Sequence, residues 1–269
     1  TLIVLTLGGA NAGIQIKLTK PEKVGMSSVR LERVGSSMRN LIDQKKIPGT
    51  VSLISRKGKI IHFEANGLRD VARKLPMELA TIFRLYSQTK PVTGAAVMIL
   101  FEEGHFLLTD PISKYLPEFS NMQVYIGQEN GNIQTEPADP ITIQQLLLHT
   151  SGLTYDFFQN PVAKMYVDNG VVSSPHQSGS LEGGMNAGTS SDLSIDQWTK
   201  LVADLPLVAQ PGTEWNYSIG MDVLGRLVEV ISGKSYSDFL SERIFKPLGM
   251  VDTGFHVPDE KLRRFAAHY

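Results

Sequence analysis

Ser87 and Lys90, three residues apart, are the first candidate catalytic residues of this sequence. A serine hydroxyl is a weak nucleophile unless a base removes its proton, and a lysine one helical turn away lies on the same face. The apolar run 92–101 predicts a buried helix, and Pro91 is tolerated in its first turn because no hydrogen bond is lost there. Ser87 is then expected at the positive end of the helix dipole, which favours developing negative charge. The bare pattern is common by chance, so other residues must support it.

Tyr217 is the second candidate, on a segment between Pro211-Gly212 and a predicted helix. A phenol has an ordinary pKa of about 10, and a neighbouring ammonium favours its phenolate form. A lysine and a tyrosine together can take the proton of a serine, which is general-base catalysis without histidine. The alternative is a half-buried aromatic residue whose hydroxyl has found a structural partner.

Other catalytic motifs fail on inspection. Residues 216–220 lack the first glycine of the nucleophile elbow of α/β-hydrolases, and residues 232–235 lack the earlier glycine of a phosphate-binding loop. The sequence contains no His-Glu-x-x-His motif.

Composition excludes several classes of function. The formal net charge is −1, so no basic surface for nucleic acid is indicated, and no apolar run is long enough to span a bilayer. Cysteine is absent, which excludes disulfides and thiolate chemistry. The six histidines lack the close pairing of helix-borne zinc sites, so no metal site is predicted.

The first twelve residues resemble the end of a secretory signal, with an apolar stretch followed by an A-x-A cleavage pattern. The basic segment expected before it is missing, and a short apolar strand or a tag remnant is the alternative. The pattern favours a periplasmic or secreted location over a cytoplasmic one.

The predicted elements are a helix capped by Ser27 or Ser28, a hairpin of strands 50–55 and 59–64 around Lys57-Gly58, and a long helical block. The helices of that block are expected at 142–149, 194–205, 221–231 and 236–245. Residues 171–192 hold few apolar side chains and predict a mobile surface loop, either a lid or a plain insertion. This order indicates an α+β protein, but two strands are too few for a stable sheet.

Four stretches in the right order make the sequence similar to the serine β-lactamase and penicillin-binding-protein superfamily, in its class C branch, and most of all to family VIII carboxylesterases. They are residues 83–90, 108–117 and 147–153, and the segment from 211–212 through 217–218 to 224–225. The resemblance implies that Ser87 is the acylated nucleophile and that Lys90 and Tyr217 form its base pair. It also implies that the backbone N–H of Ser87 is one oxyanion donor.

The same resemblance implies an antiparallel sheet flanked by helices, with an inserted all-helical domain. Residues 13–82 are then the N-terminal part of the α/β domain, 83–252 the helical domain with the nucleophile helix and the Tyr217 loop, and 253–269 the start of the return to the α/β domain. The family's third motif and its C-terminal strands lie further on, and the chain stops at Tyr269. A fragment, whose missing segment or second chain completes the sheet, is favoured over a defective relative, because an exposed half-sheet would aggregate.

The resulting hypothesis is a carboxylesterase that acts on a small-molecule ester and needs no metal or organic cofactor. Ile219 stands where relatives that cleave lactams or peptides carry asparagine, which favours esters over amides. The alternatives are a β-lactamase or D-amino-acid peptidase, and a non-catalytic relative that binds ligands. Tyr155, Phe157 and Phe158 are expected either in an apolar substrate pocket or in the helical core. His149 is assigned a structural role at a helix end.

Overall fold

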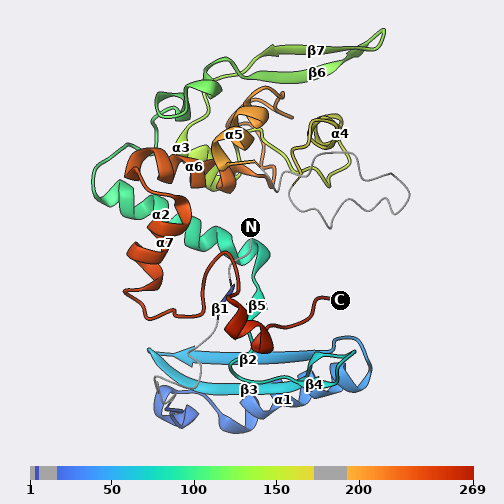
Figure 1. Ribbon diagram of the computed structural model, residues 1–269, viewed down its shortest axis with the longest axis vertical. Coiled ribbons are helices and arrows are strands. Elements are labelled where there is room, and N and C mark those ends of the chain that lie inside the picture. Colours follow the sequence, from blue (N-terminus) through green and yellow to red (C-terminus); the bar gives the residue numbers. More distant parts are fainter. Residues whose placement is uncertain (1–3, 6–16, 173–192) are drawn as a thin grey trace. The chain divides into compact units, whose positions relative to one another are not determined.

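The computed structural model describes residues 4–5, 17–172 and 193–269, and the chain forms two compact units. The first unit comprises Thr1–Ser87 and Phe245–Tyr269, and the second comprises Gln88–Ile244. Two expected features lie largely outside the described residues. They are the signal remnant, of which only Val4–Leu5 is described, and the loop expected at 171–192. Figure 1 shows the elements of each unit.

The first unit is built on a small antiparallel sheet in the order β2-β3-β4, with helix α1 packed on it (Figure 1). Their bounds are α1 (Ser28–Asp43), β2 (Gly49–Arg56), β3 (Lys59–Asp70) and β4 (Leu75–Pro76). The predicted cap is confirmed, because the Ser27 hydroxyl accepts a bond from the Arg30 amide. Val24, Leu31 and Ile61 form the buried cluster between helix and sheet.

The predicted hairpin turn is also confirmed. Lys57 and Gly58 connect β2 to β3, and both have positive φ, 52° and 68°. Two consecutive residues of positive φ match the twist of the flanking strands, which is why such turns close tight hairpins.

The C-terminal residues return to the first unit. Phe265 bridges to Ile82, and the Ile82 amide bonds to the Arg264 carbonyl at 2.8 Å. The remaining elements here are β1 (Val4–Leu5), which pairs with β5 (Phe83–Arg84), and the 3-10 helices η1 (Pro21–Val24) and η7 (Asp259–Arg264). The end of the chain therefore packs with segments nearly two hundred residues earlier in the sequence.

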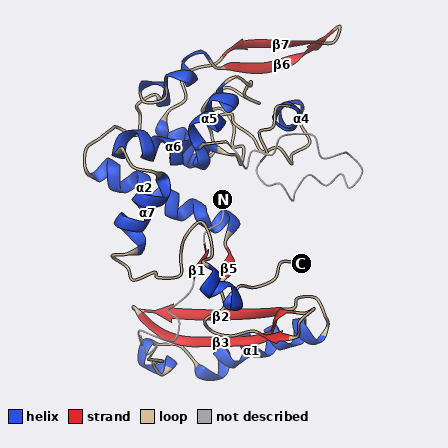
Figure 2. Cartoon of the chain, viewed as in Figure 1, coloured by secondary structure: helices blue, strands red, loops and turns tan. Residues whose placement is uncertain are grey.

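The second unit is mainly helical, and Figure 2 shows its helices in blue. Helix α6 lies at its centre, because α2, α3, α5 and α7 all pack against it. Its buried side carries Val223, Leu224, Leu227 and Val228. The helices are α2 (Thr89–Glu102), α3 (Ile143–Leu148), α4 (Pro161–Asp168), α5 (Ile195–Ala203), α6 (Gly220–Ser232) and α7 (Tyr236–Leu240), followed by a π-helical turn, η6 (Ser241–Phe245). Short 3-10 turns are η2 (Tyr86–Gln88), η3 (Ile112–Lys114) and η4 (Pro117–Asn121).

The expected all-helical character of this region needs a correction, because it also carries a β-hairpin. Strands β6 (Gln123–Glu129) and β7 (Asn132–Pro137) are red in Figure 2 and pair in antiparallel fashion. Every residue of β7 is exposed, so this strand buries no apolar face. A strand of this kind lacks the alternating apolar pattern by which strands are predicted.

No helix among the described residues is both long and apolar enough to cross a membrane.

Candidate active site

Ser87 lies in η2, the 3-10 turn that leads directly into α2. Its side chain is exposed, whereas Thr89, at the first position of the helix, is buried. Tyr86, immediately before Ser87, has φ 46°, a conformation that non-glycine residues rarely adopt. Such strained positions concentrate at functional sites, where the surrounding structure holds them. The proposed nucleophile therefore lies at a strained entry to a helix; the sequence predicted the start of the helix but not the strain.

Lys90 is the centre of a cluster of aromatic side chains in the second unit. Its ammonium donates a hydrogen bond of 2.8 Å to the hydroxyl of Tyr155. The same nitrogen lies 4.6 Å from the ring centroid of Tyr217 and 5.2 Å from that of Tyr155. A cation at this distance from an aromatic face is attracted by the ring quadrupole. The structure thus brings Lys90 and Tyr217 together from segments that are far apart in the sequence.

The sequence predicts Tyr155 either in an apolar substrate pocket or in the helical core. Its side chain is buried, and burial, followed by the negative charge of Asp222, raises the pKa of its hydroxyl far above the ordinary value. The phenol therefore stays protonated over the whole physiological range and accepts the bond from Lys90 as a neutral group. Burial is compatible with both of the predicted places, and the sequence carried no signal for this hydrogen bond.

Tyr217 is surrounded by three further rings. Its centroid lies 4.8 Å from that of His149, 5.3 Å from that of Tyr155 and 6.2 Å from that of Trp215. The Trp215 ring is nearly parallel to that of Tyr217, at 20°, and is largely exposed. Sequence reasoning did not single out Trp215, although its place two residues before Tyr217 was an available signal.

His149 ends helix α3 in the left-handed conformation, with φ 59°. The helix begins with the capping box of Thr142 and Gln145, so both of its ends have recognisable signals. The His149 side chain is buried, and its Nδ1 lies 3.2 Å from both the amide nitrogen and the hydroxyl of Ser218. Burial, and then the positive charge of Lys90, lower the pKa of the imidazole. The helix-closing role matches the expectation, but the side chain binds a distant segment rather than local backbone.

Glycine is required at position 152, three residues after His149, because another backbone segment lies very close to it. Its φ is +81°, and a Cβ at this position would collide with the backbone carbonyl of Ala209. The Gly152 carbonyl accepts a bond of 2.8 Å from the Val208 amide. Only glycine combines this backbone conformation with the close contact to the segment that leads to Tyr217.

Phe157 and Phe158 extend the aromatic cluster outward. The ring of Phe157 stacks on that of Tyr155 with centroids 4.8 Å apart, and Phe158 contacts Phe157 at 4.9 Å. Both side chains are exposed, 47% and 41%. Phe158 also lines a cavity of about 580 Å³ next to helix α4. The two rings are therefore not part of the helical core, which leaves the predicted substrate-binding role open to them.

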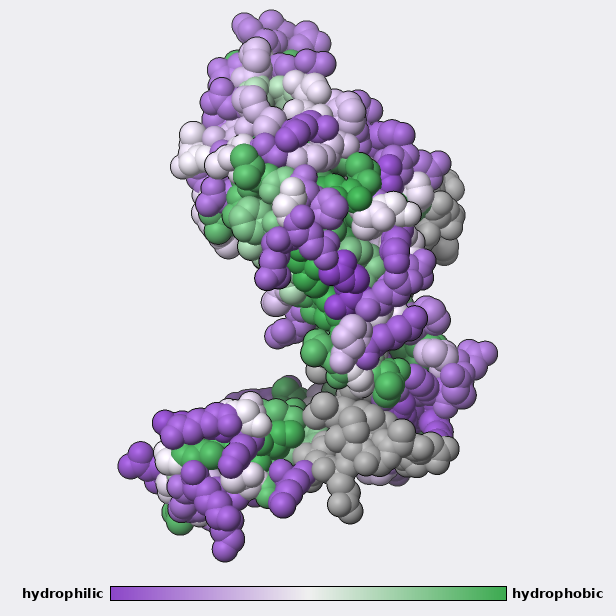
Figure 3. Space-filling view, turned by 90° about the vertical axis from the view of Figure 1, so that its left-hand side faces the viewer, coloured by the Kyte–Doolittle hydropathy of each residue, from purple (hydrophilic) through white to green (hydrophobic). Residues whose placement is uncertain are grey.

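Exposed apolar side chains elsewhere on this unit appear as green areas between hydrophilic ones in the space-filling view (Figure 3). Ile219 does not contribute to them because it is 2% exposed. Its side chain packs inside the unit, just before the first turn of α6.

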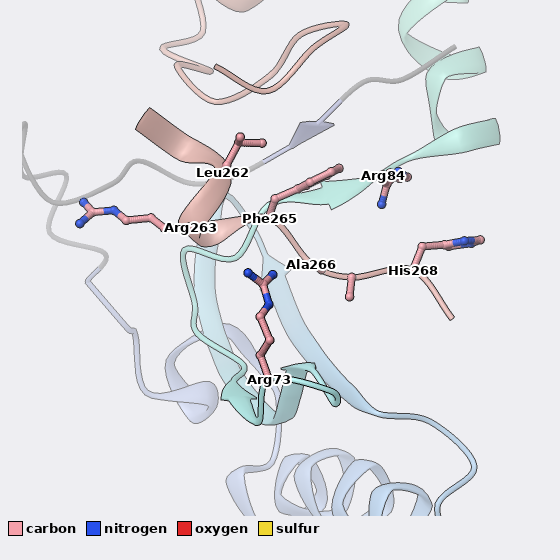
Figure 4. Close-up of a pocket in the computed structure, with 8 residues that line it drawn as sticks. Arg73, Arg84, Leu262, Arg263, Phe265, Ala266 and His268 are labelled. Carbon is pink, nitrogen blue, oxygen red and sulfur yellow. The ribbon is translucent and has the colours of Figure 1, made fainter. Parts of the chain in front are cut away.

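A second cavity, of about 510 Å³, lies in the first unit (Figure 4). Arg73 extends into it from the β3–β4 connection, and the Arg84 guanidinium stacks 4.3 Å from the centroid of the Phe265 ring. None of the predicted site residues lines it. Within the described ranges, no group of His, Cys, Asp or Glu side chains has an arrangement that could hold a metal ion.

Comparison with known proteins gives a consistent picture. A family model described as Beta-lactamase matches residues 34–269. Esterase EstB of Burkholderia gladioli is 31% identical over 237 residues, which cover 88% of this chain and 54% of EstB. An uncharacterized protein of Mycobacterium tuberculosis is 35% identical over 236 residues, or 87% of this chain and 54% of that protein.

Among solved structures, the chain is similar to EstCE1, described as a hydrolase with promiscuous acyltransferase activity. The TM-score is 0.72 at 32% identity, covering 89% of this chain and 56% of EstCE1. The expected β-lactamase/penicillin-binding-protein-like fold, of helices and antiparallel sheet, is thereby confirmed. The chain spans about half the length of the curated relatives it matches.

Proposed function

Because this chain belongs to the beta-lactamase family, we propose that its protein is a serine hydrolase that cleaves carboxylic esters through an acyl-enzyme on Ser87. The observation that carries the proposal is the placement of the Lys90 ammonium against both Tyr155 and Tyr217. A lysine held beside a tyrosine is the arrangement that can serve as a base without histidine. The similarity to an esterase and to a hydrolase supports the same reaction class.

In the proposed first step, the Ser87 hydroxyl oxygen attacks the ester carbonyl carbon while Lys90 and Tyr217 accept its proton. The backbone N–H of Ser87 donates to the oxyanion that develops on the carbonyl oxygen. Collapse of the tetrahedral intermediate breaks the C–O bond, and the same proton leaves with the alcohol.

In the second step, the base pair removes a proton from water, and the resulting nucleophile attacks the acyl-enzyme. The carboxylic acid is released and Ser87 recovers its proton. Tyr155 is proposed to hold Lys90 in place during both steps, because its raised pKa keeps the phenol neutral. No metal or organic cofactor takes part in this scheme.

An ester is proposed as the substrate rather than an amide. The amide-binding asparagine of related peptidases and lactamases has no counterpart here, since Ile219 is apolar and buried. The exposed rings of Phe157 and Phe158 are proposed to contact an apolar part of the substrate by burying its surface from water.

A second candidate is acyl transfer, in which an alcohol replaces water as the acceptor of the acyl group. It is favoured by the similarity to EstCE1, whose description includes promiscuous acyltransferase activity. The two reactions share the acyl-enzyme and differ only in the second nucleophile.

The test is hydrolysis of p-nitrophenyl butyrate by the full-length protein and its variants. Ser87→Ala is expected to abolish turnover, and Ser120→Ala, which removes a hydroxyl from a 3-10 turn of the same unit as Lys90, is the matched control. Mass spectrometry of the wild type after rapid quenching is expected to find the butyryl group on Ser87. Unchanged turnover in Ser87→Ala would refute the assignment of the nucleophile, and faster opening of a cephalosporin than of the ester would favour the lactamase.

A further inference from the structure

We propose that His149 is a positioning residue for Tyr217 and that it acts in this way only as the neutral imidazole. This inference rests on the proposed function, in which Tyr217 is part of the base. The observation behind it is that the backbone amides on both sides of Tyr217, those of Asn216 and Ser218, donate hydrogen bonds to His149.

The amide of Asn216 donates to the backbone carbonyl of His149 at 2.8 Å, and the amide of Ser218 donates to its Nδ1 at 3.2 Å. Tyr217 is the single residue between these two anchored amides. Its backbone has few remaining degrees of freedom, and its ring packs 4.8 Å from the imidazole. His149 therefore determines where the phenol of Tyr217 is presented.

The bond from Ser218 also defines the tautomer. A backbone N–H can only donate, so Nδ1 must be the acceptor and the proton of the neutral ring is on Nε2. Protonation of Nδ1 would place two N–H groups against each other. The hydroxyl of Ser218 also lies 3.2 Å from Nδ1. The hydrogen bond from the Ser218 amide to Nδ1 consequently exists only when the ring is neutral.

The surroundings of the ring favour that state. Burial, and then the positive charge of Lys90 on α2, lower the pKa of the imidazole. Another titratable side chain next to the imidazole is that of Tyr217, whose ring contacts it from the segment before α6. Helix α6 packs against α3 and carries Asp222 in its first turn, whose charge acts on Tyr155. The protonated form is thus expected only below the ordinary value of about 6.5.

The backbone conformation of His149 allows a discriminating pair of variants. Its φ of 59° is one that asparagine and glycine adopt readily. His149→Asn keeps an acceptor oxygen near the place of Nδ1 but does not titrate, whereas His149→Gly keeps the backbone and removes the acceptor. Both variants keep the bond from the Asn216 amide, because it uses the backbone carbonyl.

The first measurement is the hydrogen-exchange protection factor of the Ser218 amide in the full-length protein between pH 5 and 8. In the wild type, protection is expected to fall as the pH decreases below about 6.5. It is expected to persist in His149→Asn and to be lost at every pH in His149→Gly. Equal protection in all three proteins, or none of the pH dependence in the wild type, would overturn the inference.

The second measurement is ester hydrolysis at pH 7.5. We expect His149→Gly to lower kcat by about tenfold with a much smaller change in KM, since one buried hydrogen bond is lost. His149→Asn is expected to retain kcat within about threefold. A folded His149→Gly variant with wild-type kcat would refute the positioning role. If the wild type hydrolyses no ester, the proposed function fails, and the exchange measurement alone decides the role of His149. If His149→Gly does not fold, the pH series of the wild type and of His149→Asn decides that role.

Discussion

The ammonium of Lys90 donates a 2.8 Å hydrogen bond to the hydroxyl of Tyr155, a residue 65 positions later in the chain. Two tyrosines thus share one lysine, since the same nitrogen lies 4.6 Å from the ring centroid of Tyr217. Burial and the charge of Asp222 keep Tyr155 in its phenol form. Tyr155 is therefore proposed as the partner that holds the lysine, and Tyr217 as the tyrosine that acts as a base.

Tyr155→Phe is expected to lower kcat for p-nitrophenyl butyrate by about tenfold, because Lys90 loses an acceptor of its hydrogen bond. The stacking on Phe157 is preserved, so the free energy of unfolding should fall by no more than about 1.5 kcal/mol. Steady-state kinetics and urea unfolding measure the two effects. Tyr125→Phe, on the β6–β7 hairpin, is the matched control and should change neither. Wild-type kcat in Tyr155→Phe would show that the bond to Lys90 is not needed.

Phe158→Ser is expected to reduce kcat/KM for long-chain esters more than for an acetate ester, because an apolar contact contributes about 25 cal/mol per Å² of buried surface. The side chain is already 41% exposed, so little stability should be lost. A series of p-nitrophenyl esters from acetate to octanoate measures the dependence. Leu107→Ser, at an exposed position in the same unit, serves as the control. An equal loss for every chain length would exclude Phe158 from the acyl-binding surface.

Acid destabilisation is expected to involve Asp110. Its carboxylate accepts bonds from the Tyr115 hydroxyl, the Lys114 ammonium and the Leu107 amide, and these lower its pKa from 3.8 to about 2. A depressed pKa in the folded state means that this stabilisation is complete above pH 3.8 and is lost as the pH falls toward 2. Urea unfolding of the wild type and Asp110→Asn between pH 5 and 2 should show the two free energies converging at low pH. A constant difference between them would contradict the assignment.

Asp252 is expected to be essential for the stability of the first unit. Its side chain is 2% exposed and accepts two bonds from the Arg264 guanidinium, at 2.9 and 2.6 Å, with Lys261 at 2.9 Å. Asp252→Ala should cost about 3–5 kcal/mol, because Arg264 is then left largely buried without its counter-charge. Asp168→Ala, which breaks an exposed i,i+4 pair with Lys164, should cost no more than about 1 kcal/mol. Thermal and urea unfolding compare the two, and equal costs would contradict the prediction.

Local signals in the sequence predicted much of the fold. The Ser27 cap, the Lys57-Gly58 turn and the helix that starts after Thr142 all formed where expected, because each depends on residues within a few positions of one another. Hairpin β6–β7 was missed, because β7 buries no apolar face and so lacks a periodic pattern. The Asn130-Gly131 pair, both with positive φ, was the turn signal available for it. The expected domain boundaries remain predictions.

For the site, the sequence by itself determined the candidates. The spacing of Ser87 and Lys90 and the motif around Tyr217 follow from residue types and their order, and the family is visible in the same stretches. Tertiary structure alone decided that Tyr155 bonds to Lys90 and that His149 binds the amide of Ser218. These contacts join residues 65 and 69 positions apart, and no local propensity encodes them. They exist because the packing of α2 and α3 on α6 brings separate segments within hydrogen-bonding distance.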